Sequence, residues 1–506
     1  MTSQEVTIGV RTLENGAINS QALKRRILNG DVLTSHGNRR GRQHILEILE
    51  AGLQAADPYY ATRKLLRMEG DKLIVGNADF EPAGSPRTGD EVIDLSKIGR
   101  IFVFGAAKGV QRVAKAIEDV LGDRITGGCV IPKHGDEIIL ERIKVIPGAH
   151  PVPDEGCVEG CREILRMCQG LREDDLVFTV IGNGVSSLLT LPAPGVSLED
   201  VRKTTYIMQI ERGAPTGDLN AVRNHLDMMK GGRISRYLQP AKAIHIIAVD
   251  PSSYDQLMHH NLWLHTLPDC TTFADAVAML KKWDAWEAVP ASVRAYLEKA
   301  DPAAETVKAA EFEQGDFRIF GVMPNHLSMV PAAMAKAAEL GYKPYKLTSF
   351  LHAEASQAGL VIADIARNVE RDGEPFEPPC ALFSTGELLV TVGKEKGIGG
   401  RNQEYVLSAA LRIAGSENIV MAGVDSDGTD GPGTQFAEGC TDLPQLTGGI
   451  VDGQTVAEAK ARGVDMRAEI RRHNSTAALC RLDSGVVATQ NISVGDLDVT
   501  LIMGRG

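Results

Sequence analysis

Apolar residues recur along this chain in two alternating patterns, short continuous runs and longer stretches with a helical period. The runs at 100–105, 127–133, 175–182 and 243–250 resemble parallel strands that are buried on both faces. The stretches between them carry apolar residues every three or four positions, which predicts helices. Strands that alternate with helices in this way predict an open α/β sheet with helices on both sides.

The last third of the chain continues this alternation. Apolar runs separated by helical stretches occur at 317–322, 344–350, 380–392, 418–426, 485–489 and 497–503. A polar, acidic segment at 301–316 is predicted to be a linker. We therefore expect an N-terminal extension at 1–41, a first domain at 42–300 and a second α/β domain within 317–506. A single amphipathic helix over 42–66 is expected to open the first domain.

Composition narrows the class of protein. Of 506 residues, 43% are hydrophobic and 24% are charged, and no stretch approaches the ~20 apolar residues of a membrane span. The opening residues lack the apolar core of a signal peptide, so we expect a cytoplasmic protein. A net charge of -12 opposes nucleic-acid binding, which needs clustered Lys and Arg. The expected partner is a small molecule, with no nucleic acid or membrane, and a homo-oligomer stays open.

Cysteine spacing argues against both a disulfide framework and a zinc site. The chain has eight scattered cysteines and no CxxC pair. Cys157, Cys161 and Cys168 share one helical face with Ile164 and Leu165, so we expect them to pack in a core.

Two basic residues stand at predicted helix starts. Lys108 follows a strand and opens a helix, where the macrodipole disfavours a cation by ~0.3–1 kcal/mol. Arg401 follows a glycine-rich loop that ends in Gly399 and Gly400, and it also opens a helix. A ligand phosphate or carboxylate would compensate each charge, and exposure of the side chain to solvent is the alternative for Lys108.

A second basic cluster lies in the segment NAVRNHLDMMKGGR. Asn220, Arg223, Lys230 and Arg233 are closely spaced there, and a guanidinium suits a carboxylate or a phosphate. The alternative is structural, because a basic helix end capped by Gly231 complements the helix dipole. The sequence leaves both interpretations open.

The segment GVDSDGTDGPG places three aspartates on a turn after a strand. It lacks the sixth-position glycine and the closing glutamate of a calcium loop. Magnesium held by Asp427 and Asp430 together with substrate phosphates fits the pattern better. Plain turn chemistry is the alternative.

Taken in order, these segments resemble the class II glycerate kinases. The resemblance covers residues 42 to 503 and is strongest in LERIKVIPGAHPVPDEG, NAVRNHLDMMKGGR, LPDCTTFADA, GGRNQE and GGIVDGQTVAEAKARG. It implies a Rossmann-like α/β sandwich and a smaller MOFRL-type α/β domain at about 377–503. It also implies phosphoryl transfer from ATP, with Mg²⁺, to the 2-hydroxyl of D-glycerate. The family's catalytic lysine and arginine match Lys108 and Arg401.

The chain departs from the family in its small-residue loops. Where the family has Ser-Gly-Gly-Gly-Ser-Ala, this chain has GNGVSS, and Val185 cannot adopt a conformation that only glycine tolerates. An anion near Ser186 is still expected, as part of the substrate site. The residues that we assign to nucleotide binding are Gly182, Gly184, Ser187, Gly399 and Gly400.

A second departure replaces small and acidic residues by bulky ones in AVDPSSYDQLMHHNLWLHT. His259 and His260 are expected to contact the substrate, and with Tyr254, Trp263 and His265 they would favour a polyhydroxylated acid of four to six carbons. Surface packing of these histidines is the alternative.

Three functions remain open on this pattern. The first is a kinase that acts on a hydroxy acid or sugar acid. The second is a relative that has lost ATP and acts on a sugar acid or sugar phosphate as a lyase or isomerase. The third is a sensor that binds the acid without catalysis.

Overall fold

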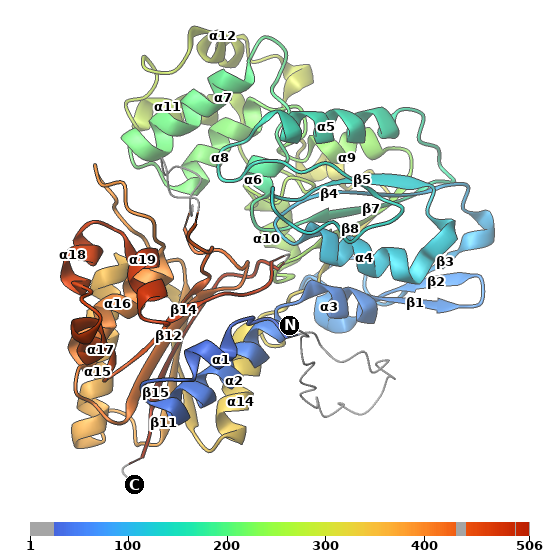
Figure 1. Cartoon of the computed structure of the whole chain (residues 1–506). Helices are drawn as coiled ribbons and strands as arrows, with labels where there is room; N and C mark the ends of the chain where they lie inside the picture. The colour runs from blue at the N-terminus through green and yellow to red at the C-terminus, as the bar shows by residue number, and fades with distance from the viewer. Residues whose placement is uncertain (1–24, 432–441, 491, 505–506) are drawn as a thin grey trace. The chain divides into compact units, whose positions relative to one another are not determined.

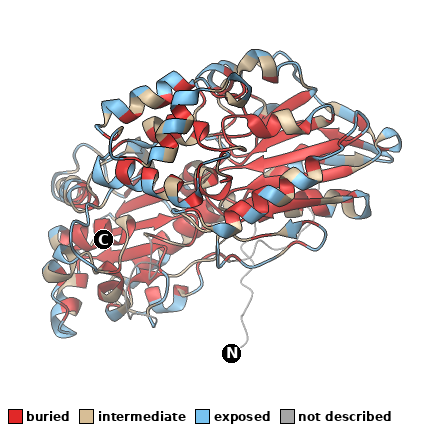
Figure 2. Ribbon diagram, turned by 90° about the horizontal axis from the view of Figure 1, so that it is seen from above, coloured by how far each residue is buried: buried red, intermediate tan, exposed pale blue. Residues whose placement is uncertain are grey.

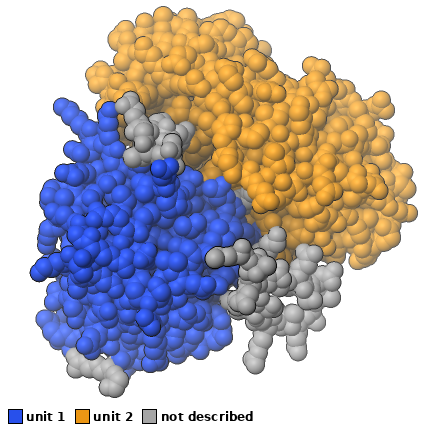
Figure 3. Space-filling view, viewed as in Figure 1, with its two compact units in different colours: residues 1–57, 325–506 blue, residues 58–324 orange. Residues whose placement is uncertain are grey.

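The computed structural model describes residues 25–431, 442–490 and 492–504. Their backbone falls into two compact units (Figure 3). One unit is Pro58–Pro324, and the other combines residues 25–57 with residues 325–504. The second unit is therefore built from two parts of the chain that are far apart in sequence. The domain boundaries drawn from the sequence stay a prediction.

Six parallel strands form the centre of the Pro58–Pro324 unit. Across the sheet their order is β6-β5-β4-β7-β8-β9, which is the order of a Rossmann fold. Figure 1 labels the four middle strands, β5, β4, β7 and β8. Strands β5 and β6 are added on one side of β4, and strands β7 to β9 on the other. The position between β4 and β7, where the strand order reverses, is the topological switch point. The strands span Ile101–Ala106 (β4), Gly127–Ile131 (β5), Lys144–Val145 (β6), Leu176–Ile181 (β7), Lys242–Ile247 (β8) and Phe317–Gly321 (β9).

Helices cover both faces of this sheet, and every residue of β4 and β7 is buried (Figure 2). Helices α4 (Val110–Leu121) and α5 (Glu155–Cys168) lie on opposite faces in Figure 1. Cys157, Cys161 and Cys168 of α5 are buried in the core, as expected from their spacing. The α/β sheet that the continuous apolar runs predicted is confirmed.

Smaller elements complete this unit. A helical group with its own apolar core consists of α7 (Leu198–Thr205), α8 (Thr216–His225), α11 (Phe273–Lys282) and α12 (Ala291–Lys299). Strands β1 (Leu66–Glu69), β2 (Lys72–Val75) and β3 (Glu91–Asp94) form a short antiparallel sheet. The segment predicted as a linker carries only one turn of 3₁₀ helix, Pro302–Ala304, and the short helix α13 (Ala309–Phe312).

The other unit contains a mixed six-stranded sheet in the order β10-β11-β15-β12-β13-β14. Strand β10 is parallel to β11, and the remaining neighbours are antiparallel. The strands span Lys343–Leu351 (β10), Cys380–Gly386 (β11), Ile419–Asp425 (β12), Gly448–Asp452 (β13), Gly485–Val486 (β14) and Asp496–Ile502 (β15).

Alternate residues of this second sheet face two different cores. On one side lie α15 (Ala355–Asp372) and α16 (Arg401–Ile413), and three short helices complete that layer. On the other side lie α2 (Arg39–Ala55) and α14 (Met329–Glu339). The short helices are α17 (Thr455–Ala461), α18 (Met466–Arg471) and α19 (Ser475–Arg481). The second α/β domain expected from the sequence is confirmed as a fold class.

The single helix predicted over 42–66 is wrong. The structure has two helices there, because α2 ends at Ala55 and α3 (Pro58–Leu65) begins at a proline. Proline favours the first turn of a helix and disrupts its interior, so a break before Pro58 is the physical outcome. The break coincides with the boundary between the two units. Among the described residues, no helix is long and apolar enough to span a membrane.

Candidate active site at the switch point of the parallel sheet

Lys108 lies at the switch point, just after β4, beside the loop that follows β7. Its backbone N–H donates to the carbonyl of Asn183 at 2.8 Å. A Cβ placed on Gly184 would lie 2.9 Å from Cγ of Lys108 and 3.2 Å from Cδ2 of His150. The lysine stem therefore packs over the loop. Ligands of open α/β sheets bind in the crevice at this end of the strands.

The loop after β7 places its strained position on a glycine. Gly184 has a φ of +82°, whereas Val185 begins the short helix α6 (Val185–Leu188) with a buried side chain. A left-handed conformation suits glycine and not valine, which explains how the loop tolerates Val185. Ser187 donates its hydroxyl to the carbonyl of Ala149 at 3.0 Å, so this hydroxyl is occupied by the protein itself.

Ser186 contacts a buried histidine, His265, which the sequence placed among the residues that could line the pocket but not among the assigned substrate ligands. Its Oγ lies 2.9 Å from Nε2 of His265, whose residue surface is only 1% exposed. Burial, and then the nearby positive charges of Lys230 and Arg223, hold the pKa of His265 well below its usual value. The imidazole is therefore neutral at physiological pH.

Lys230 is buried, and the carboxylate of Asp227 compensates its positive charge. Its Nζ donates to Oδ2 of Asp227 at 2.7 Å and to the hydroxyl of Thr190 at 2.8 Å. Asp227 also accepts from the backbone N–H groups of Met229 and Lys230. Such a paired charge fixes the loop around it, and its electrostatic attraction for a ligand is reduced by the carboxylate.

Arg223 differs from Lys230, because no carboxylate of the described residues pairs with it. Nη2 and Nε donate to Oδ1 of Asn220 at 2.8 Å and 3.2 Å. Burial lowers the pKa of Arg223 to about 10. A half-buried guanidinium without a counter-ion is a strong candidate for binding an anion. Asn220, itself buried, orients it.

Arg233 uses its donors on the backbone. The guanidinium donates to the carbonyls of Asn224, Lys230 and Ala304, the last at 2.5 Å from Nη2. Burial lowers its pKa below the ordinary value. These contacts tie the end of α8 to the segment at 304, so the geometry supports a structural role for Arg233.

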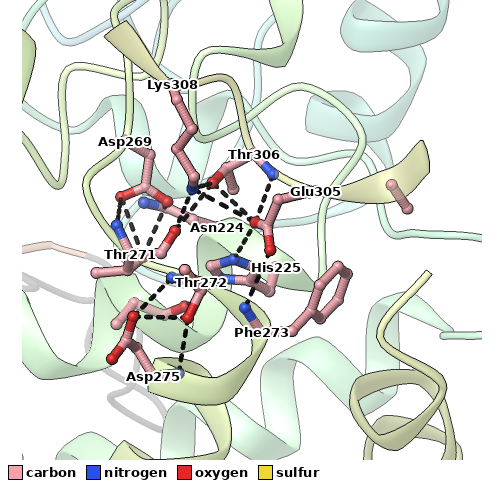
Figure 4. Close-up of polar contacts among 12 residues, drawn as sticks. Asn224, His225, Asp269, Thr271, Thr272, Phe273, Asp275, Glu305, Thr306 and Lys308 are labelled. Atoms are coloured by element: carbon pink, nitrogen blue, oxygen red, sulfur yellow. Dashed lines mark hydrogen bonds and ion pairs between the residues drawn. The ribbon is translucent and has the colours of Figure 1, made fainter. Parts of the chain in front are cut away.

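A polar network beside α8 holds the same segment in place (Figure 4). His225 is fully buried, and its Nδ1 and Nε2 each lie 2.8 Å from an acceptor, the carbonyl of Ala221 and Oε1 of Glu305. Glu305 also accepts from the backbone N–H groups of Phe273 and Thr306. The network fixes the C-terminal turn of the helix that carries Arg223.

His259 and His260 are exposed at the end of α10 (Tyr254–His259). His260 forms a 3.6 Å ion pair with Asp255 on the same short segment. These positions match surface packing, the alternative considered for the two histidines. The third histidine of the segment, His265, turns inward to Ser186.

Arg401 lies in the other unit, at the start of α16, and is held by two carboxylates. Its Nε and Nη2 donate to Asp496 at 2.6 Å and 2.8 Å, and Nη2 also donates to Asp425 at 2.9 Å. Although burial lowers it, Asp425 and Asp496 raise the pKa of Arg401 above its ordinary range. Nη1 makes no hydrogen bond to the described residues, so this nitrogen is left to donate to a ligand.

Asp430 caps the helix that Arg401 opens. Its carboxylate accepts from the backbone N–H groups of Asn402 at 3.2 Å and Gln403 at 2.9 Å. Burial raises the pKa of Asp430 to about 6. A Cβ on Gly400 would lie 2.3 Å from the Asp430 side chain, so the glycine permits this close approach. A Cβ on Gly399 would lie 2.2 Å from Oγ of Ser475, so this position is constrained to glycine in the same way.

The aspartate turn of residues 425–430 forms the hydrogen bonds of an ordinary turn, and it also carries carboxylates that could bind a metal. Oδ1 of Asp427 accepts from the backbone and hydroxyl of Thr429 at 2.8 Å and 2.6 Å. Across the parts of the chain that the structure describes, no group of three or more His, Cys, Asp or Glu is arranged to hold a metal. Mg²⁺ bound chiefly by ligand phosphates needs only one or two carboxylates. Asp427 would be the carboxylate that holds such an ion.

Comparisons with known proteins agree with this arrangement. Residues 44–298 match the family model described as Domain of unknown function (DUF4147), and residues 380–493 match the MOFRL family. The chain is 35% identical to a glycerate 2-kinase of Pyrococcus horikoshii over 91% of its own length and 98% of the relative's length. It is 33% identical to a D-glycerate 2-kinase of Thermotoga maritima, over 82% and 93% of the two chains.

Similarity in three dimensions extends over the same length. A solved glycerate kinase from Thermotoga maritima matches with a TM-score of 0.69 and 30% identity, over 91% of this chain and 99% of that one. Two features of the chain agree with this similarity. The Rossmann-type sheet carries a lysine at its switch point, and the MOFRL domain carries the arginine of GGRNQE. By fold, motif and full-length similarity, the chain belongs to the class II glycerate kinase family.

Proposed function

We propose that this chain is an ATP-dependent kinase that phosphorylates a hydroxyl group of glycerate or a closely related hydroxy acid. The observation that carries this function is the 35% identity to a glycerate 2-kinase over nearly the full length of both proteins. The lyase, isomerase and sensor alternatives are not favoured, because the similar proteins described above are named as kinases.

Lys108 is proposed to neutralise phosphate charge. Phosphoryl transfer needs little covalent chemistry from the protein and much stabilisation of negative charge on the transferred group. The position of Lys108 at the switch point, over the Gly184 loop, supports this role. The glycines at 182 and 184 allow a nucleotide to approach the backbone closely, and they are the nucleotide-binding residues we propose in this unit.

Arg223 is proposed to bind the carboxylate of the acid. It is a half-buried cation that lacks a carboxylate partner within the described residues, and, unlike Arg233, its printed hydrogen bonds go only to the amide oxygen of Asn220. A guanidinium binds a carboxylate through two parallel hydrogen bonds. Lys230 adds positive potential from a fixed position. Arg233 supports the loop through the backbone.

Arg401 and the aspartate turn, which belong to the other unit, are proposed to neutralise the charge of the transferred phosphate. Asp496 and Asp425 fix the guanidinium plane, which leaves Nη1 to donate. Mg²⁺ would neutralise phosphate oxygens, with Asp427 as its protein ligand, because Asp430 is committed to the helix cap.

Glycerate is the first acceptor to test. The exposure of His259 and His260 removes the main support for a larger polyhydroxylated acid. The decisive experiment measures ADP release and product mass with ATP, Mg²⁺ and a panel of acids from three to six carbons. We expect equal amounts of ADP and phosphorylated glycerate. No ATP consumption with any acid, or a mass change without ADP release, would refute the kinase.

A further inference from the structure

The contact between Ser186 and His265 has an unusual hydrogen-bond balance. Nε2 of His265 lies 2.9 Å from the serine Oγ, and Nδ1 is buried with no hydrogen-bond partner among the described residues. A neutral imidazole carries one hydrogen, on one of its two nitrogens. The position of this hydrogen decides which way the serine hydroxyl points.

The hydrogen belongs on Nε2. If Ser186 donated to Nε2, the imidazole hydrogen would sit on Nδ1 as a buried donor without an acceptor, which is the costlier arrangement. With the hydrogen on Nε2, His265 donates to Ser186, and Nδ1 is left as an unpaired acceptor. The serine oxygen is then an acceptor in this pair, and its own hydrogen is directed elsewhere.

Nothing in the described residues accepts that hydrogen. The contact with His265 is the hydrogen bond that the described structure gives to the Ser186 side chain. Arg223 and Lys230 are close enough to lower the pKa of His265, so positive charge surrounds the pair. A group that both accepts a hydrogen and is attracted by cations is an anionic oxygen.

We propose that His265 is a positioning residue that directs the Ser186 hydroxyl toward an anionic oxygen of a bound substrate. This inference rests on the proposed kinase function. The oxygen can belong to the carboxylate of the acid or to a phosphate of ATP, since both are acceptors with negative charge.

A second serine- or threonine-to-histidine pair, in strands β7 and β8 of the same unit, serves as an internal control. His245 is also fully buried, its Nδ1 lies 2.7 Å from the hydroxyl of Thr179, and its Nε2 has no partner among the described residues. Its ring packs against Phe312 and Phe317, with centroids 5.3 Å and 5.0 Å away. This pair faces an aromatic core and is structural, so its loss reports on folding alone.

The experiment is a double-mutant cycle in the full chain with Ser186→Ala, His265→Leu and the double variant. We expect each single variant to lower kcat/KM about 10- to 100-fold, the effect of losing one hydrogen bond to a charged group. The double variant should match Ser186→Ala, because His265 acts through the serine. His265→Gln, which keeps an N–H donor, should recover most of the loss. His245→Leu should lower Tm and leave kcat/KM unchanged.

The Michaelis constants identify the source of the oxygen. A rise in KM for glycerate alone assigns the carboxylate, and a rise in KM for ATP alone assigns a phosphate. Multiplicative losses in the double variant, or unchanged kinetics in folded His265→Leu protein, overturn the proposal. A thermal-shift assay with inorganic phosphate tests the proposed role of His265 independently of the kinase function, because it needs no turnover. A Tm gain in the wild type that Ser186→Ala and His265→Leu both lose supports the proposal even without turnover, and no gain with phosphate, glycerate or ATP overturns it.

Discussion

Replacing Arg223 with methionine should stabilise the substrate-free protein and weaken its binding of the acid. The side chain stays long and unbranched, but the buried positive charge is removed. Most substitutions of buried residues destabilise proteins, so an increase in Tm would be an informative result.

The size of the effect follows from the environment of the guanidinium. Burial lowers the pKa of Arg223 to about 10, which corresponds to about 3 kcal/mol against the charged form in the folded protein. Both states carry the charge well below pH 10, so this cost is fully present at neutral pH. The substitution also removes the hydrogen bonds from Arg223 to Asn220, which lowers the free energy of unfolding by about 1–2 kcal/mol. The net gain of about 1–2 kcal/mol raises Tm by roughly 2–6 °C.

Arg233→Met is the matched control for stability. Arg233 donates to three backbone carbonyls that would be left unsatisfied, so this variant should lose about 3 kcal/mol and unfold at lower temperature. The assays are differential scanning fluorimetry without substrate and initial rates over a range of glycerate concentrations. We expect KM for glycerate to rise about 100-fold in Arg223→Met. A lower Tm for Arg223→Met, or an unchanged KM, would show that the guanidinium is not an uncompensated anion site.

Three further outcomes are expected. Lys108→Ala and Arg401→Ala should each lower kcat about 100-fold or more, because each removes a donor to developing charge, and near-normal turnover in folded variants would contradict both roles. Asp427→Asn should raise the Mg²⁺ concentration needed for half-maximal rate, and an unchanged titration would leave the loop with turn chemistry alone. Burial lowers the pKa of His245 to about 3, so the unfolded chain binds more protons below pH 6.5 and stability should fall with pH from there toward 3. His245→Leu should reduce that slope in fluorimetry from pH 7 to 4, and an unchanged slope would exclude the group.

Strands of the parallel sheet could be predicted because their burial on both faces leaves a direct mark on the sequence. Runs such as 175–182 are continuous and apolar, and the structure places β7 within that run. Strand β13 was missed, since its five residues begin with two glycines that resemble a turn. The composition of the second unit was also out of reach, because the contacts of α2 are made with strands far along the chain.

Within the candidate site, residue type was predictable and role was not. Arg223 and Arg233 carry the same charge in one segment, and only their partners, Asn220 or backbone carbonyls, distinguish them. The sequence placed His265 with His259 and His260 at the pocket and could not show that His265 alone turns inward. The buried Asn261 folds the segment by accepting from the N–H of Leu264 and donating to the carbonyl of Pro268, and such bonds between a side chain and the backbone leave no periodic signal.

The unit formed by both ends of the described chain has a consequence for synthesis. Helix α2 leaves the ribosome early with the apolar side chains of Ile45, Leu49 and Leu53, whose partners include Leu497 and Val499 near the other end of the sequence. At ~5–20 residues per second, translation of the intervening chain takes tens of seconds. During that time Pro58–Pro324 can complete its own sheet, while α2 remains a client for any chaperone that binds exposed apolar helices. A chain that terminates before β15 would therefore keep one folded half and leave without cover the part of its first long helix that packs against Leu497 and Val499.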